Sequence, residues 1–178
     1  SRFGFNDPSC PTFGVHLTDI DGFAVAEAVR ALDPTLRLLI LSCQLDDFTV
    51  LKIEKIGVQG FLDKATNAVE AIGAAIDAIA AGRIYFSEQF LRIQRARKND
   101  SGSFDKILSD AEQDVLGLVG RGLSDEEIGR RMGIAPTTAQ THRSHLLRKL
   151  GIKSTPKLIV YAQQKGFAHI ASRPPFAA

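Results

Sequence analysis

The sequence predicts two domains of different fold class: an α/β domain with a parallel sheet, followed by an all-α domain of short helices. Three observations support this division. Within residues 1–91, apolar runs of strand length alternate with helical patterns, which is typical of a parallel sheet covered by helices. Residues 92–104 are polar and include Asn-Asp-Ser-Gly-Ser, a composition that favours a linker. Over residues 105–170 only helical patterns remain, and residues 171–178 are expected to form a tail.

The elements of the first domain are expected to alternate as helix, strand, helix, strand and helix. LRLLILS (36–42) is an apolar run of strand length, and VQGFLDK (58–64) contains a shorter one. The segments around these runs predict helices because each reaches a Pro or Gly that closes a helix. These helical segments are 22–34, 46–57 and 67–82. On the last helix Val69, Ile72, Ile76 and Ile79 are predicted to share one face.

Four helices are predicted in the second domain, at about 109–119, 124–132, 136–150 and 155–165. Two of them begin with the spacing of a capping box, Ser109 with Glu112 and Ser124 with Glu127. In a capping box each side chain accepts a hydrogen bond from a backbone N–H that the helix leaves unsatisfied. Each helix is too short to be stable alone, so the four are expected to pack together.

Charge is distributed unevenly along the chain. Residues 1–104 contain 11 basic and 13 acidic residues, whereas residues 105–178 contain 11 basic and 7 acidic ones. From Ile128 to the C-terminus there are nine Lys or Arg residues and no Asp or Glu. This asymmetry favours a polyanionic partner for the second domain, and a solvated charged face is the alternative.

The third helix of the second domain has one apolar and one polar side. Ala139, Leu146 and Leu150 cluster on the apolar side, with Leu147 at its margin. The opposite side carries amide, hydroxyl and cationic groups. It consists of Thr137, Gln140, Thr141, Ser144 and Arg148, with Arg143, His145 and Lys149 on its flanks. Such groups suit base edges and phosphates, and an α-helix fits the major groove. Together with the preceding short helix and the turn MGIAP, the pattern predicts a DNA-reading helix-turn-helix.

A series of short motifs lies along residues 107–154. In chain order they are Leu108-Ser109, Glu112, Val115-Leu116, Gly122-Leu123-Ser124, Glu127-Ile128, Thr138, His142 and Lys149-Leu150-Gly151. In this order they resemble the LuxR/NarL (FixJ-type) DNA-binding domain. The resemblance implies that bases are read by Gln140, Thr141 and Ser144. It implies backbone contacts from Thr137, Thr138, Arg143, Arg148 and Lys149, and dimerisation through Leu158, Ile159 and Ala162. The family usually has Val-Lys where this chain has Ala139-Gln140, so its preferred DNA site cannot be copied from relatives.

The first domain resembles the receiver domain of a response regulator, whose flavodoxin-like sheet has the strand order 2-1-3-4-5. Ser42, Phe61 and Lys64 match the family's Ser/Thr, its aromatic switch residue and its Lys. In the family these residues respond to a phosphoryl group on an Asp at the end of the third strand. We expect them to be switch remnants here.

The phosphoacceptor position of this receiver-like domain falls on Gly14, counting back from the loop TDIDG that ends at Gly22. Glycine has no carboxylate, and the count places the nearby Asp19 and Asp21 in the loop. The N-terminal strands of a receiver have no counterpart in the sequence, so an incomplete sheet is expected. A strand over Pro11–Val15 would then lie at its edge and pair with another chain in a dimer, unless the N-terminal part of the receiver lies outside this sequence.

These features predict a sequence-specific DNA-binding transcription regulator of the response-regulator type that is not switched by conventional Asp phosphorylation. We expect a cytoplasmic homodimer on double-stranded DNA, with RNA polymerase or a histidine kinase as a further partner. The alternatives are a phosphorylation-switched regulator with its acceptor elsewhere, and a receiver-like adaptor that heterodimerises with another regulator. No nucleophile–base pair, cofactor motif or metal-ligand spacing is found, so no enzyme, cofactor or metal is expected. No apolar run approaches the roughly 18 residues that cross a membrane.

Overall fold

The computed structural model describes residues 22–64 and 69–167. They form two compact units, which we call unit 1 (22–45, 49–64 and 69–96) and unit 2 (46–48 and 97–167). The predictions for Gly14, Asp19, Asp21, the strand over Pro11–Val15 and the tail lie outside the described residues.

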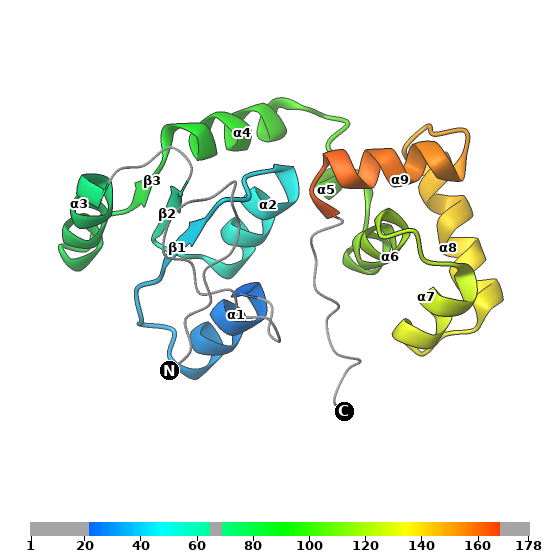
Figure 1. Cartoon of the computed structure of the whole chain (residues 1–178), viewed down its shortest axis with the longest axis horizontal. Helices are drawn as coiled ribbons and strands as arrows, with labels where there is room; N and C mark the ends of the chain where they lie inside the picture. Colours follow the sequence, from blue (N-terminus) through cyan, green and yellow to red (C-terminus); the bar gives the residue numbers. More distant parts are fainter. Residues whose placement is uncertain (1–21, 65–68, 168–178) are drawn as a thin grey trace. The chain divides into compact units, whose positions relative to one another are not determined.

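The described sheet of unit 1 is parallel, as predicted. Its strands are β1 (Leu39–Ser42), β2 (Gly60–Asp63) and β3 (Tyr85–Phe86), in the order β1-β2-β3 (Figure 1). The register places Ser42 beside Asp63 and Phe61 beside Phe86. The strand β3 was not predicted, because two residues carry no periodic pattern.

Four helices surround this sheet: α1 (Gly22–Leu32), α2 (Asp47–Ile56), α3 (Val69–Ala80) and α4 (Glu88–Asn99). Val50 and Ile53 of α2 join Phe61 and Phe90 in one buried cluster. The α3 helix packs on the strands, and a Cβ added at Gly60 would lie 2.6 Å from the Ile79 side chain. Helices therefore cover the sheet, as the apolar strands predicted.

The apolar face predicted for α3 is not buried throughout. Ile76 is 53% exposed, whereas Ala75, Ala78 and Ile79 are buried. The buried stripe is centred on small residues, since these allow α3 to approach the strands closely. Ile76 lies about 100° around the helix from Ala75 and faces outward.

The linker predicted at 92–104 is largely helical. The α4 helix extends to Asn99, and residues 100–103 alone connect it to α5 (Phe104–Ile107). Phe90 anchors the start of α4 in the core, and the Gln94 amide donates to Glu54 Oε1 at 2.8 Å. The polar composition thus belongs to the exposed side of a helix that is buried along its other side.

Unit 2 contains the four predicted helices and the short α5, which was not predicted. They are α6 (Asp110–Gly120), α7 (Asp125–Met132), α8 (Pro136–Lys149) and α9 (Thr155–Gln164). Both predicted capping boxes are confirmed. The α6 helix packs beside α8 and α9, and α7 packs beside α8 (Figure 1).

Candidate nucleic-acid interface

The turn between α7 and α8 is held by two glycines. Gly133 ends α7 with φ 68°, a left-handed conformation that glycine adopts without steric cost. Gly129 lies against the turn itself, so that an added Cβ would be 2.8 Å from the Ile134 carbonyl oxygen. The Ile134 N–H donates to the Gly129 carbonyl at 3.0 Å. The two helices therefore meet in the close arrangement of a helix-turn-helix.

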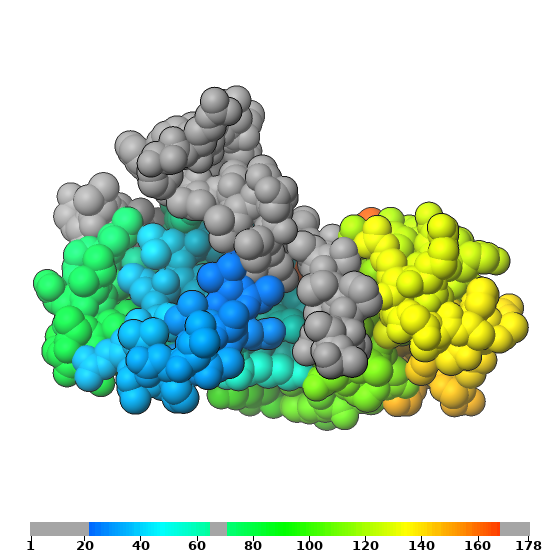
Figure 2. Space-filling view, turned by 90° about the horizontal axis from the view of Figure 1, so that it is seen from below, coloured from blue at the N-terminus to red at the C-terminus, as the bar shows by residue number. Residues whose placement is uncertain are grey.

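The predicted division of α8 into a buried and an exposed side is confirmed. Ala139 and Leu146 are fully buried, while Leu147 and Leu150 are half-buried at the margin. The polar residues Thr137, Thr138, Gln140, Thr141, Ser144 and Arg148 are all exposed. Figure 2 shows the atoms of α7 and α8, in yellow, forming one outer surface of unit 2.

Two hydroxyl groups on the exposed side of α8 are oriented by the helix backbone. Thr141 Oγ1 donates to the Thr137 carbonyl at 2.9 Å, and Ser144 Oγ donates to the Gln140 carbonyl at 3.0 Å. Both bonds run back four residues, the usual arrangement for a hydroxyl within a helix. The two oxygen atoms are therefore fixed relative to the helix axis.

Arg143, predicted to contact the DNA backbone, is bound to the start of α7. Its Nε donates to Asp125 Oδ1 at 2.9 Å, and its Nη2 donates to the Leu123 carbonyl at 3.0 Å. The Nη2 atom lies 2.8 Å from the same carboxylate oxygen, and the side chain is 15% exposed.

Lys149, the second flanking cation, is bound to the start of α6. Its Nζ lies 2.8 Å from Glu112 Oε2, the oxygen that also accepts the Ser109 N–H of the capping box. Burial of the Glu112 carboxyl opposes its ionisation. The hydrogen bonds from Lys149 and Ser109 outweigh this effect and lower its pKa.

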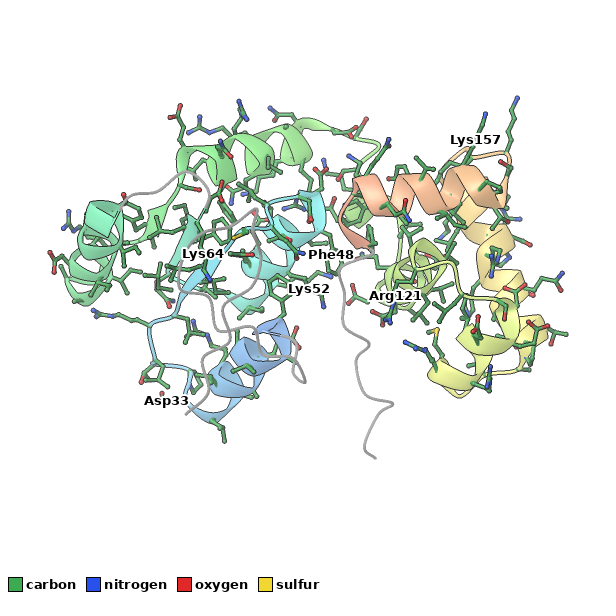
Figure 3. The ribbon with its side chains drawn as sticks, in the orientation of Figure 1. Asp33, Phe48, Lys52, Lys64, Arg121 and Lys157 are labelled. Atoms are coloured by element: carbon green, nitrogen blue, oxygen red, sulfur yellow. The ribbon has the colours of Figure 1, made fainter. Side chains whose placement is uncertain are left out.

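Within residues 136–164, three cations are exposed and have no ion pair with a carboxylate among the described residues: Arg148, Lys153 and Lys157. Arg148 is on the exposed side of α8, Lys153 is in the connection that follows, and Lys157 is on α9. Figure 3 shows Lys157 pointing away from unit 2. Of these three cations, the sequence predicted a DNA contact only for Arg148. The other two were missed because charge alone does not show which side chains are paired.

Two residues predicted to dimerise lie instead in the core of unit 2. Leu158 and Ala162 are fully buried, and a Cβ added at Gly120 would lie 2.8 Å from that of Ala162. They serve the packing of α9 on α6, which resemblance alone could not separate from a role between protomers. Ile159 is half-buried, and the neighbouring Val160 is 50% exposed.

The switch remnants lie at or near the carboxyl edge of the sheet. The backbone N–H of Lys64 donates to the Ser42 carbonyl at 2.9 Å, and Ser42 Oγ accepts the Gln44 N–H at 3.0 Å. Lys64 follows β2 and is labelled in Figure 3. Phe61 is fully buried, with its ring centroid 5.3 Å from that of Phe90. Asp63, which sequence reasoning did not single out, is buried beside Ser42.

The described residues contain neither a cluster that suits a metal ion nor a helix that could cross a membrane. No three His, Cys, Asp or Glu side chains there gather in a way that suits a metal ion. Among the helices of residues 22–64 and 69–167, none is both long and apolar enough to cross a membrane.

Comparison with known proteins extends over most of the chain. The family described as bacterial regulatory proteins, luxR family, matches residues 106–162. The transcriptional regulatory protein MctR of Rhizobium johnstonii is 31% identical over 159 residues, which are 89% of this chain and 73% of MctR. BvgA of Bordetella pertussis, a putative positive transcription regulator of virulence factors, is 29% identical over 163 residues, 90% of this chain and 78% of BvgA.

One further curated protein and one solved structure are also similar to this chain. The response regulator protein VraR of Staphylococcus aureus is 26% identical over 148 residues, covering 83% of this chain and 70% of VraR. The structure of RcsB from Salmonella enterica serovar Typhimurium bound to a promoter aligns at 20% identity with a TM-score of 0.48, over 82% of this chain and 68% of RcsB. The chain belongs to the LuxR family of bacterial regulatory proteins, as a DNA-binding transcription regulator of the response-regulator type.

Proposed function

We propose that α8 enters the major groove of double-stranded DNA, where Gln140, Thr141 and Ser144 read base edges. Thr137, Thr138 and Arg148 contact the backbone on either side. The observation that carries this proposal is the division of α8, whose polar residues are all exposed while Ala139 and Leu146 anchor it in the core. An anchored helix with one polar side is the element that reads a groove.

Charge supports the same orientation. No Asp or Glu follows Glu127 in the sequence, so the exposed side of α8 repels no phosphate. Lys153 and Lys157 continue the basic surface beyond the end of α8. Cations on such a surface release counterions from DNA when they meet phosphates, which makes binding depend steeply on salt.

The test uses the full chain and a duplex that it selects from a random library of about 20 base pairs, enough for two half-sites. Gln140→Ala should lose about 1–3 kcal/mol of discrimination at one base-pair position, because Gln makes a paired hydrogen bond to adenine. Gln89→Ala is the matched control, since Gln89 is an exposed glutamine on α4 of unit 1. An unchanged sequence preference in Gln140→Ala would remove this residue from the reading side.

The chain is further proposed to bind as a homodimer through the exposed side of α9, where Ile159 and Val160 lie. Two copies would then read half-sites about one helical turn apart. Mixing the chain with a longer tagged copy on the selected duplex should give one complex of intermediate mobility. Only the two parental mobilities would be seen if each duplex binds one copy. RNA polymerase, a histidine kinase and a cytoplasmic location remain predictions.

Switching is proposed not to use an Asp at the position that matches the family's acceptor, because Gly14 stands there. Treatment with a small phosphodonor, followed by mass spectrometry of the intact chain, should leave the mass unchanged. One added phosphoryl group would favour the alternative of an acceptor elsewhere. A chain that selects no duplex at all would favour the adaptor alternative.

A further inference from the structure

We infer that Arg143 and Lys149 position the recognition helix and do not bind phosphate. This inference rests on the proposed reading of DNA by α8 and revises the backbone contacts that resemblance implies. Both cations lie on the flanks of the exposed side of α8, yet both are bound to carboxylates of the same unit.

Each cation ties α8 to the first turn of a different helix. Arg143 binds Asp125, the first residue of α7, and also the Leu123 carbonyl just before it. Lys149 binds Glu112, the third residue of α6 and part of its capping box. The two ties are six residues apart on α8, which is about 9 Å along the axis. Two separated ties fix the rotation of α8 about its axis, whereas one would leave it free to pivot.

Rotation of α8 matters because base reading tolerates little displacement. A side-chain tip lies about 5–6 Å from the helix axis, so a rotation of about 20° would move it by roughly 2 Å. A binding constellation needs its groups within about 0.5 Å of the productive position. A small rotation would therefore move Gln140 away from its base edge while the helix stays folded.

The environment of each pair opposes its exchange for a phosphate contact. The Glu112 side chain is 9% exposed, so removal of Lys149 would leave a buried carboxylate without its cation. Arg143 is similarly enclosed and already uses Nε and Nη2. Lys149, at 39% exposure, is the more accessible of the two and makes the stricter test.

The experiment removes the carboxylates and keeps the cations. In the full chain, Glu112→Gln retains a residue that suits a capping box, and Asp125→Asn retains a residue of nearly the same size. Each variant removes the negative charge that holds its cation and raises the net charge by one. Glu88→Gln gives the same change of charge at an exposed residue of α4, outside α6, α7 and α8, and is the control.

Affinity is measured for the selected duplex and for a scrambled duplex of the same composition, at several salt concentrations. If the cations position α8, Glu112→Gln and Asp125→Asn should lower the selected-to-scrambled ratio about tenfold relative to Glu88→Gln, with an unchanged salt slope. If the freed cations bind phosphate, both duplexes should bind more tightly and the slope should steepen by about one. The second result overturns the inference.

Three further variants and a folding control keep the result interpretable. Lys149→Met should reproduce the lost ratio, and Lys149→Arg should restore it, since Arg still reaches Glu112. Circular dichroism at the assay temperature shows whether each variant is folded, and a loss of ratio in a folded chain is not explained by stability alone. Arg148→Met should lower the salt slope by about one. Failure of that variant, or a wild-type ratio of one, would count against the proposed DNA binding itself and not against this inference.

Discussion

Replacement of Gly129 by Ala should disturb the helix-turn-helix at its tightest contact. The new Cβ would lie 2.8 Å from the Ile134 carbonyl oxygen and 3.3 Å from the Pro136 nitrogen. Both are backbone atoms, so no side chain can rotate to make room. The turn would have to move away from α7, and the hydrogen bond from the Ile134 N–H to the Gly129 carbonyl would weaken.

The expected cost follows from two opposing effects. Overpacking costs about 1–3 kcal/mol, and weakening the hydrogen bond adds up to about 1 kcal/mol. Ala in a helix recovers about 1 kcal/mol relative to Gly. The net loss of stability is therefore about 0–3 kcal/mol, and its central value of roughly 1.5 kcal/mol lowers the Tm of a unit of this size by about 6–12 °C.

The assay is thermal unfolding of the full chain, followed by circular dichroism, together with affinity for the selected duplex. Gly73→Ala is the matched control, because Gly73 lies within α3 and an added Cβ would meet nothing within 4 Å. That control should gain about 0.5–1 kcal/mol. Our account of the turn fails if Gly129→Ala unfolds at or above the wild-type temperature and binds the selected duplex equally well.

Two other predictions concern the starts of helices. Ala135 has the extended backbone of an N-cap but provides no side-chain hydrogen bond, so Ala135→Ser should stabilise unit 2 by about 1 kcal/mol in urea unfolding; an unchanged midpoint would contradict this. The pKa of Glu112 is lowered from an ordinary value of 4.5, so its contribution to stability is present above that pH and is lost as pH falls through the folded-state pKa. Glu112→Gln should therefore flatten the loss of Tm on acidification, and a parallel acid profile would contradict the assignment.

The sequence predicted those features that depend on local patterns. Capping boxes located the starts of α6 and α7, and helical periodicity separated Ala139 and Leu146 from the polar side of α8. Features that depend on distant partners were missed. Arg143 and Lys149 meet carboxylates 18 and 37 positions away, and no periodicity reveals such a pair.

The other differences between prediction and structure involve very short elements, a polar composition that did not indicate a helix, and burial that depends on a neighbouring helix. The two residues of β3 pair with β2 only in the folded sheet, and α5 has four residues. Over residues 92–99 a polar composition concealed a helix that is anchored by Phe90. Burial of Leu158 and Ala162 also depends on α6, because the absence of a side chain at Gly120 allows the α9 backbone to come close.

The hydroxyl groups of Thr141 and Ser144 have a consequence for base composition. While their protons are donated to backbone carbonyls within α8, these side chains offer only lone pairs to a duplex. Lone pairs complement the exocyclic amines of adenine and cytosine in the major groove and oppose the carbonyl oxygens of guanine and thymine. Adenine or cytosine is therefore the base expected opposite each hydroxyl.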